Sequence, residues 1–252
     1  TNAGDKIYFK NTLLSDNTQN DYLHFSMYGQ IAASGYVESM TLGDRVSSQI
    51  PDVPYAYAYY GMFEGCAALV SIPSMRNSEH EFAYGFCRMY KSCSGLTNVD
   101  LGTLSGEAPY LYANMFQYCN NLQQVTGEIS QAASYCCDNM FMGCSNLQSG
   151  PQLSAENAPS YCYHQMFTGC YALQTAPALP ATELGEYCYH LMFDNCTSLK
   201  NPPELPATSL ANYCYSYMFN NCQQLVSAPT LPATELAEQC YVGMFKYCKS
   251  LV

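Results

Sequence analysis

Hydrophobic residues in this chain return at a fixed interval that predicts a repeating structure. A methionine followed by an aromatic residue recurs about every 26 residues, with a cysteine four residues later and a leucine seven residues later. We count positions within each repeat from this methionine, which is position 0. The methionines are Met62, Met89, Met115, Met140, Met166, Met192, Met218 and Met244. This regularity indicates a solenoid, in which each unit buries its apolar face against its neighbours.

The first half of each repeat has the spacing of an amphipathic helix. Apolar residues stand at positions −4, −3, 0, +1 and +4, which fall on one face of a helix. In the regular repeats a proline stands just before a threonine, as in Pro180 and Thr182, and threonine is a good N-cap. We therefore expect a helix of about eleven residues that begins near Thr182 and ends near Phe193, with equivalents in the other repeats.

The second half of each repeat predicts a short strand. The column leucine opens an extended segment such as Leu173–Ala176, and Pro177, Pro203 or Pro229 follows in the regular repeats. Because proline cannot donate to a sheet ladder, parallel pairing should stop after about three residues. The order strand, turn, helix, turn predicts an α/β, right-handed solenoid with short parallel strands plus helices. It should comprise eight 26-residue repeats over residues 55–252.

The repeat resembles a known family. Blocks such as MFTGCYALQTAPALPATELGEYCYHLMFDNC look like the BspA-like leucine-rich repeats of bacterial surface proteins. The signature is an aromatic residue, a cysteine three residues on, a leucine three further, and a strand that ends in proline. The resemblance implies a curved leucine-rich-repeat solenoid with its parallel sheet on the concave side, exported to the bacterial cell surface or secreted. It also implies adhesion or host interaction, and it brings no catalytic residues.

The two ends of the chain differ from the repeats between them. Residues 1–54 lack the repeat and contain three segments of alternating polarity, at Lys6–Lys10, Tyr22–Ser26 and Tyr36–Leu42. These segments predict a β-rich N-terminal cap that covers the apolar end of the solenoid. The chain stops two residues into the next expected strand, at Val252. We expect either that the natural chain continues or that a partner covers this end.

Composition and charge exclude two classes of partner. The net charge is −11, and the nine basic residues form no cluster that would bind a phosphate backbone. Nucleic acid is therefore not an expected partner. No apolar run reaches the roughly 20 residues that a membrane-spanning helix requires, so no membrane span is expected.

The cysteines and histidines raise the question of metal binding. Fifteen cysteines occur without a Cys-x-x-Cys motif, so we interpret their columns as small buried residues that are mostly reduced. Disulfides and metal binding remain lesser alternatives. His164 and His190 share position −2, whose occupants vary so much that we expect it to face solvent. Helices about 10 Å apart would hold these rings too far apart to share a metal. We predict no metal and no cofactor.

A polar ladder on the strands is the predicted binding surface. Each column leucine except Leu251 is followed, two residues later, by a small or medium uncharged polar residue, and these side chains should point out of the concave sheet. They are Ser71, Asn98, Gln124, Ser149, Thr175, Asn201 and Ser227. Tyrosines at position −5, such as Tyr161, Tyr187 and Tyr213, form an alternative surface on the convex edge, although packing explains them equally well.

Together with the family resemblance, which implies the location and the adhesin-like role, these features predict a non-enzymatic, adhesin-like protein of the bacterial cell surface or medium that binds a protein or glycan ligand. A catalytic set needs irregular residues that meet at one place, whereas packing accounts for the repeated cysteine, methionine and aromatic columns. The alternative is an accessory, ligand-presenting module of a larger secreted enzyme.

Overall fold

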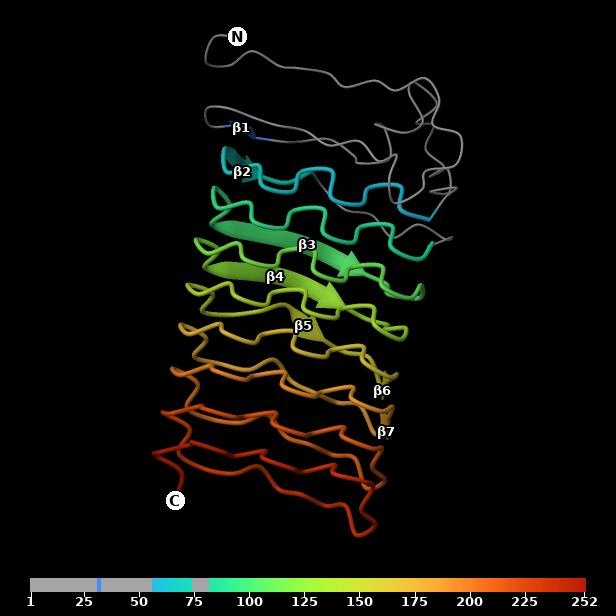
Figure 1. Ribbon diagram of the computed structural model, residues 1–252, viewed down its shortest axis with the longest axis vertical. Helices are drawn as coiled ribbons and strands as arrows, with labels where there is room; N and C mark the ends of the chain where they lie inside the picture. Colours follow the sequence, from blue (N-terminus) through green and yellow to red (C-terminus); the bar gives the residue numbers. More distant parts are fainter. Residues whose placement is uncertain (1–30, 33–55, 74–81) are drawn as a thin grey trace.

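The repeats stack as the rungs of a solenoid. The computed structural model describes residues 31–32, 56–73 and 82–252. Within this part of the chain, each rung lies against the next along one long axis (Figure 1). Every rung combines an extended segment with a ribbon of turns, and the two segments enclose the core between them.

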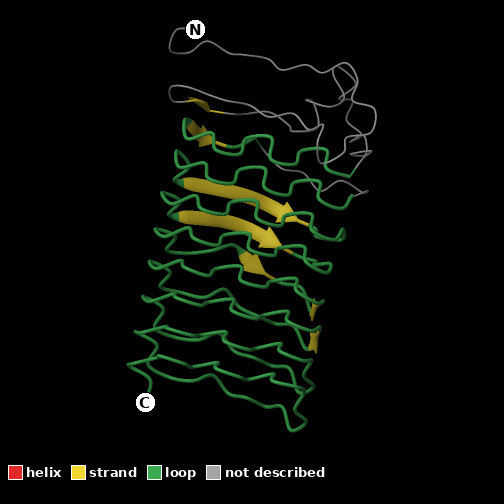
Figure 2. Cartoon of the chain, viewed as in Figure 1, coloured by secondary structure: helices red, strands yellow, loops and turns green. Residues whose placement is uncertain are grey.

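The prediction of helices is wrong, because the described residues contain only strands, turns and loops (Figure 2). The segment 182–193 instead holds strand β7 (Glu183–Leu184) followed by consecutive turns. The backbone is left-handed at positions −5, −1 and +3, as at Tyr161 (φ 59°), Gln165 (φ 53°) and Gly169 (φ 74°). A left-handed residue at every fourth position is incompatible with a right-handed helix.

Positions −5 to +4 form a ribbon whose main-chain hydrogen bonds alternate in direction; we call this segment the turn ribbon. The Tyr163 N–H donates to the carbonyl of Cys188 in the next rung at 3.0 Å. The N–H of the following residue, His164, donates to the Tyr161 carbonyl three residues earlier at 3.3 Å. The alternation continues along the ribbon, so a buried backbone is satisfied partly within the rung and partly by its neighbour.

The hydrophobic pattern agrees with this ribbon because its period is four. Positions −4, 0 and +4 point into the core together, and so do −3 and +1. Met166, Phe167 and Cys170 are all 0% exposed. Over so short a segment a period of four is hard to distinguish from 3.6. Glycine and asparagine at positions −1 and +3 carry the distinguishing signal, since both tolerate a left-handed backbone: Gly61, Gly65, Asn114, Asn139, Gly143, Gly169, Asn195, Asn221 and Gly243.

Side chains of successive rungs form continuous ladders inside the solenoid. At position +1, the Phe193 ring stacks on Phe167 at 5.7 Å and on Phe219 at 5.6 Å between ring centroids. At position +4, the Cys196 thiol donates to the Phe167 carbonyl of the preceding rung at 3.2 Å. Each rung therefore needs the same side-chain volume at the same place, which explains the repeated columns.

The strands pair in parallel between neighbouring rungs. Strand β1 (Ile31–Ala32) pairs with β2 (Leu69–Ser71), and β6 (Asn157–Ala158) pairs with β7. The largest sheet has the order β3 (Asn98–Leu104), β4 (Gln124–Ile129) and β5 (Gln152–Leu153). All of these pairs are parallel, as the sequence predicts.

Proline determines how far each strand extends. Strands β3 and β4 contain no proline and run for seven and six residues, longer than the expected three. Where Pro177 and Pro203 follow the leucine segment, pairing shrinks to an isolated bridge between Thr175 and Asn201. The missing N–H of proline accounts for this difference.

The two sides of the solenoid have similar rung spacings. Leucine-rich solenoids bend when helices about 10 Å wide lie behind strands about 4.8 Å apart. Here the turn ribbons hydrogen-bond directly to one another, as the strands do. The rungs accordingly follow one another with little bend (Figure 1). We therefore use the name strand face for the surface that the resemblance places on a concave side.

Most of the N-terminal segment lies outside this description. The strands expected at Lys6–Lys10, Tyr22–Ser26 and Tyr36–Leu42, and with them the β-rich cap, fall outside the described residues. Within residues 1–54 the structure describes β1 alone, which pairs with the first rung through β2.

Candidate functional site

The structure brings the predicted polar residues into one ladder on the strand face. Ser71 ends β2, and Asn98 and Gln124 begin β3 and β4. Asn98 pairs with Gln124, Gln124 bridges to Ser149, and Thr175 bridges to Asn201. Ser71 is half-buried, and the other six are exposed: Asn98, Gln124, Ser149, Thr175, Asn201 and Ser227.

Alternation along the longer strands positions this ladder, because Asn98 and Gln124 are exposed and the residues that follow them, Val99 and Val125, are buried. Leu173, two residues before Thr175, is 0% exposed, and Leu199 stands in the same relation to Asn201. The column leucine lies between the turns and the strand, so the strand alternation starts after it and the residue two positions later is exposed. This surface could be predicted from the sequence because the buried leucines and the polar residues recur with the same repeat.

Two carboxylates on the same face were missed by the sequence reasoning. Asp100 lies on β3, and its Oδ1 accepts a hydrogen bond from the Thr126 hydroxyl at 3.0 Å. Glu128 on β4 accepts a hydrogen bond from Ser154. Both belong to rungs without a strand proline, so the longer strands extend the polar face beyond the ladder. The absence of proline after Leu96 and Leu122 was the available signal.

The alternative surface is a continuous column of stacked tyrosines at position −5. Adjacent ring centroids lie 4.5–4.7 Å apart, and all seven side chains are half-buried. They are Tyr57, Tyr84, Tyr110, Tyr135, Tyr161, Tyr187 and Tyr213. Since each ring face between the ends is covered by a neighbour, the column presents ring edges and hydroxyls.

The two histidines do not face solvent as expected. His164 and His190 are half-buried beside the tyrosine column, and their ring centroids are 5.3 Å apart. The prediction of a wide separation was wrong because turn ribbons, unlike helices, pack at the spacing of paired strands. His164 Nδ1 lies 2.7 Å from Asp138 Oδ1, whereas both ring nitrogens of His190 are buried without a hydrogen-bond partner.

The environment of His190 predicts a loss of stability in acid. Burial and the nearby His164 lower the pKa of His190 to about 4. The unfolded value is about 6.5, so protons favour the unfolded state and stability falls as the pH drops from about 6.5 towards 4. His190→Phe keeps a ring beside Tyr187 and removes the titration. Between about pH 7.5 and pH 5 the wild type should lose about 1 kcal/mol more than the variant, a figure reduced for partial exposure.

Urea unfolding of both proteins at the two pH values measures this difference. His164 and Asp138 remain in both proteins, so their contribution cancels in the comparison. Equal losses of stability would show that His190 is hydrated or paired in the folded state.

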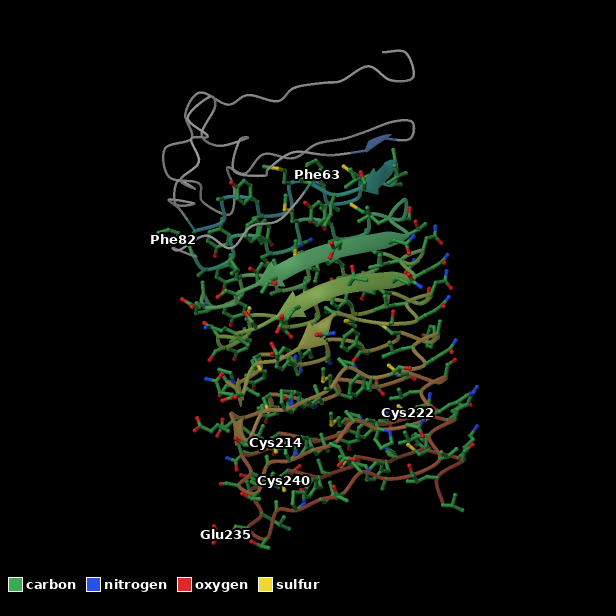
Figure 3. The ribbon with its side chains drawn as sticks, turned by 180° about the vertical axis from the view of Figure 1, so that it is seen from behind. Phe63, Phe82, Cys214, Cys222, Glu235 and Cys240 are labelled. Carbon is green, nitrogen blue, oxygen red and sulfur yellow. The ribbon has the colours of Figure 1, made fainter. Side chains whose placement is uncertain are left out.

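Thirteen of the fifteen cysteines form two columns, at positions −4 and +4, and Cys87 and Cys137 lie outside them. Among the fifteen, all of which are described, no disulfide is present; fourteen are buried and Cys248 is half-buried. Cys214 and Cys240 lie in neighbouring rungs near one edge, and Cys222 lies towards the other (Figure 3). Burial raises the pKa of Cys87 to about 12 and also raises that of Cys248.

We therefore expect the folded protein to react slowly with a thiol reagent. The thiolate is the reactive form, and burial disfavours it and blocks access. Only Cys248 should react readily in the native state, and all fifteen should react after unfolding without reductant. Cys248→Ala should remove the rapid phase. Rapid native labelling of several thiols, or a total well below fifteen after unfolding, would contradict this expectation.

Two further properties concern only the described residues. No three His, Cys, Asp or Glu side chains there are grouped to hold a metal ion. No helix in residues 31–32, 56–73 and 82–252 is long and apolar enough to cross a membrane.

Comparison with known proteins identifies the family. The family model described as a BspA type leucine rich repeat region (6 copies) matches residues 60–192 and 110–252. These matches span most of the chain, so the protein belongs to the BspA-type leucine-rich repeat family.

The chain is also similar to a protein of known structure. A leucine-rich repeat protein from Bacteroides ovatus is similar at 14% identity and a TM-score of 0.39, over 83% of this chain. The chain spans 58% of that protein. None of the curated proteins matches.

Proposed function

We propose that this chain is a non-enzymatic interaction module of the bacterial exterior, exposed on the cell surface or secreted. Its ligand is a protein segment or a glycan that lies along the strand face. Family membership supports an interaction role, since leucine-rich repeats present extended binding surfaces. The exposed polar ladder is the observation that carries the proposal.

The ladder suits an extended ligand better than a compact one. Its uncharged hydroxyls and amides recur at strand spacing, about 4.8 Å per rung. A single neutral hydrogen bond contributes only about 0.5–1.5 kcal/mol, so useful affinity requires contacts over several rungs. Binding to the uncharged part of the ladder should depend weakly on salt, whereas a ligand that also reaches Asp100 and Glu128 would be more sensitive.

An array of purified host matrix proteins and glycans provides the test, followed by affinity measurement on each ligand found. Gln124, Thr175 and Asn201 are changed together to alanine, which removes three exposed ladder contacts. The control changes Tyr161, Tyr187 and Tyr213 to phenylalanine, which removes hydroxyls from the tyrosine column and keeps its stacking.

The ladder variant should bind at least about tenfold more weakly, and the tyrosine variant should bind like the wild type. Both variants should unfold at nearly the same denaturant concentration as the wild type. A ligand whose affinity changes only in the tyrosine variant would move the site to the tyrosine column. Unchanged affinity in both would exclude both surfaces.

A further inference from the structure

A hollow lies on the outer side of the turn ribbons, away from the polar ladder. It measures about 320 Å³, and we call it the slot. Its cause is a local change of size at position −2, where Cys87 and Ala113 stand between the larger Tyr60 and Asp138. Two successive rungs with small residues leave space between the tyrosine column and the outer residues of the ribbon.

One wall of the slot is the first part of the tyrosine column. Tyr84 stacks on Tyr57 at 4.7 Å and on Tyr110 at 4.6 Å, so neighbouring rings cover both its faces. Ring edges and hydroxyls are left to line the slot, and the edge of an aromatic ring carries partial positive charge. Burial and the nearby tyrosines raise the pKa of Tyr110 to about 12, so its hydroxyl remains a donor at neutral pH.

The opposite wall carries two cations, in a chain whose net charge is −11. Arg88 is held by Glu64, 2.6 Å from its Nη2, and by the Tyr60 hydroxyl, 3.1 Å from its Nη1. Its Nε is buried without a hydrogen-bond partner. Lys91, also lining the slot, is half-buried and forms no ion pair with any described residue. These groups leave positive charge that Glu64 does not neutralise.

The far end of the slot offers a carboxylate that can accept hydrogen bonds and an amide beside it. Asp138 Oδ1 accepts from the Asn139 amide and lies beside His164 Nδ1, each at 2.7 Å. No described group donates to Oδ2, which therefore remains able to accept a hydroxyl. The amide of Asn114 lines the slot between this carboxylate and the cations and can both donate and accept.

We propose that the slot binds one carboxylated sugar ring, such as a uronic acid residue of an acidic glycan. The ligand carboxylate lies near Lys91 and Arg88, and its ring hydroxyls hydrogen-bond to Asp138 and Asn114. The volume suits a single ring. An acidic peptide satisfies the cations equally well but has no row of hydroxyls for Asp138 and Asn114, so the sugar is favoured.

The test titrates the methyl glycoside of glucuronic acid into the whole ¹⁵N-labelled chain and follows backbone amide shifts. Methyl glucoside, which lacks the carboxylate, and an N-acetylated glutamate amide are the comparison probes. Lys91→Gln removes the unpaired cation, and Asn114→Gly removes the amide while tolerating the left-handed φ of 57°. Lys246→Gln is the matched control, because Lys246 occupies the same position in the last rung.

The glucuronide should shift the amides of Cys87, Arg88 and Asn114, and added salt should weaken its binding. Lys91→Gln should reduce affinity about three- to tenfold, Asn114→Gly should reduce it less, and Lys246→Gln should leave it unchanged. Equal binding of methyl glucoside, or shifts spread over the molecule, would overturn the proposal. Tighter binding of the glutamate derivative would assign the slot to an acidic peptide. None of these outcomes bears on the strand face, whose test uses different residues.

Discussion

Replacing Phe193 by alanine is expected to lower the free energy of unfolding by about 3–5 kcal/mol. Phe193 is 0% exposed and sits in the middle of the inner aromatic ladder, between Phe167 and Phe219. The substitution leaves a cavity and removes two stacking contacts at once. Close packing from rung to rung leaves little room for the ladder to collapse into the gap.

The control is the equivalent residue of the last rung. Phe245 stacks only on Phe219, at 5.7 Å, and is half-buried, so Phe245→Ala should cost much less. Denaturant unfolding of both variants gives the comparison. Similar, small losses for the two would show that the inner ladder contributes little to stability.

Replacing Asn195 by valine should destabilise the protein by about 2–4 kcal/mol. Asn195 has a φ of 61°, a conformation that a β-branched residue strongly disfavours. Its amide also donates to Asp194 and its carbonyl oxygen accepts from Asn221, each at 2.7 Å. Valine therefore adds backbone strain and removes both hydrogen bonds.

Asn195→Gly separates these two effects. Glycine accepts the left-handed backbone without strain but cannot replace the amide, so its cost should be about 1–2 kcal/mol, smaller than that of valine. Urea unfolding of the two variants measures the difference. Valine tolerated as well as glycine would mean that residue 195 does not have a left-handed backbone in solution.

The sequence predicted the stacking and the core because each depends on a column that repeats. The leucine, cysteine and methionine columns are buried as expected, apart from the half-buried Cys248 and Leu251. The polar residues two positions after the leucines are exposed in the strand-face ladder, apart from the half-buried Ser71. Parallel pairing followed from the same repeat. These features require only that neighbouring rungs be alike.

The sequence predicted a helix in place of the turn ribbon, because the hydrophobic pattern indicates which residues face the core. It does not indicate the backbone conformation that brings them there. Positions −4, 0 and +4 satisfy a helix and a four-residue turn nearly equally. Gly169 and Asn195 carried the missing information, since such residues are poor helix formers and favour a left-handed backbone.

The remaining errors follow from this one. Paired turn ribbons lie closer together than helices, so His164 and His190 come within 5.3 Å and are half-buried. The slot was not foreseen either, because it arises where position −2 departs from its neighbours in size, at Cys87 and Ala113. The repeated columns predict the positions that all rungs have in common, whereas the slot depends on a difference in side-chain size between neighbouring rungs.

Backbone chemical shifts of residues 182–196, measured by NMR on the intact chain, test the turn ribbon most directly. The structure predicts left-handed backbone shifts at Tyr187, Leu191 and Asn195, where φ is 56°, 55° and 61°, interrupted by turn residues between them. It also predicts slow amide exchange at Tyr189, whose N–H donates to the Cys214 carbonyl of the next rung at 3.0 Å. An unbroken run of helical shifts from Thr182 to Phe193 would contradict the account.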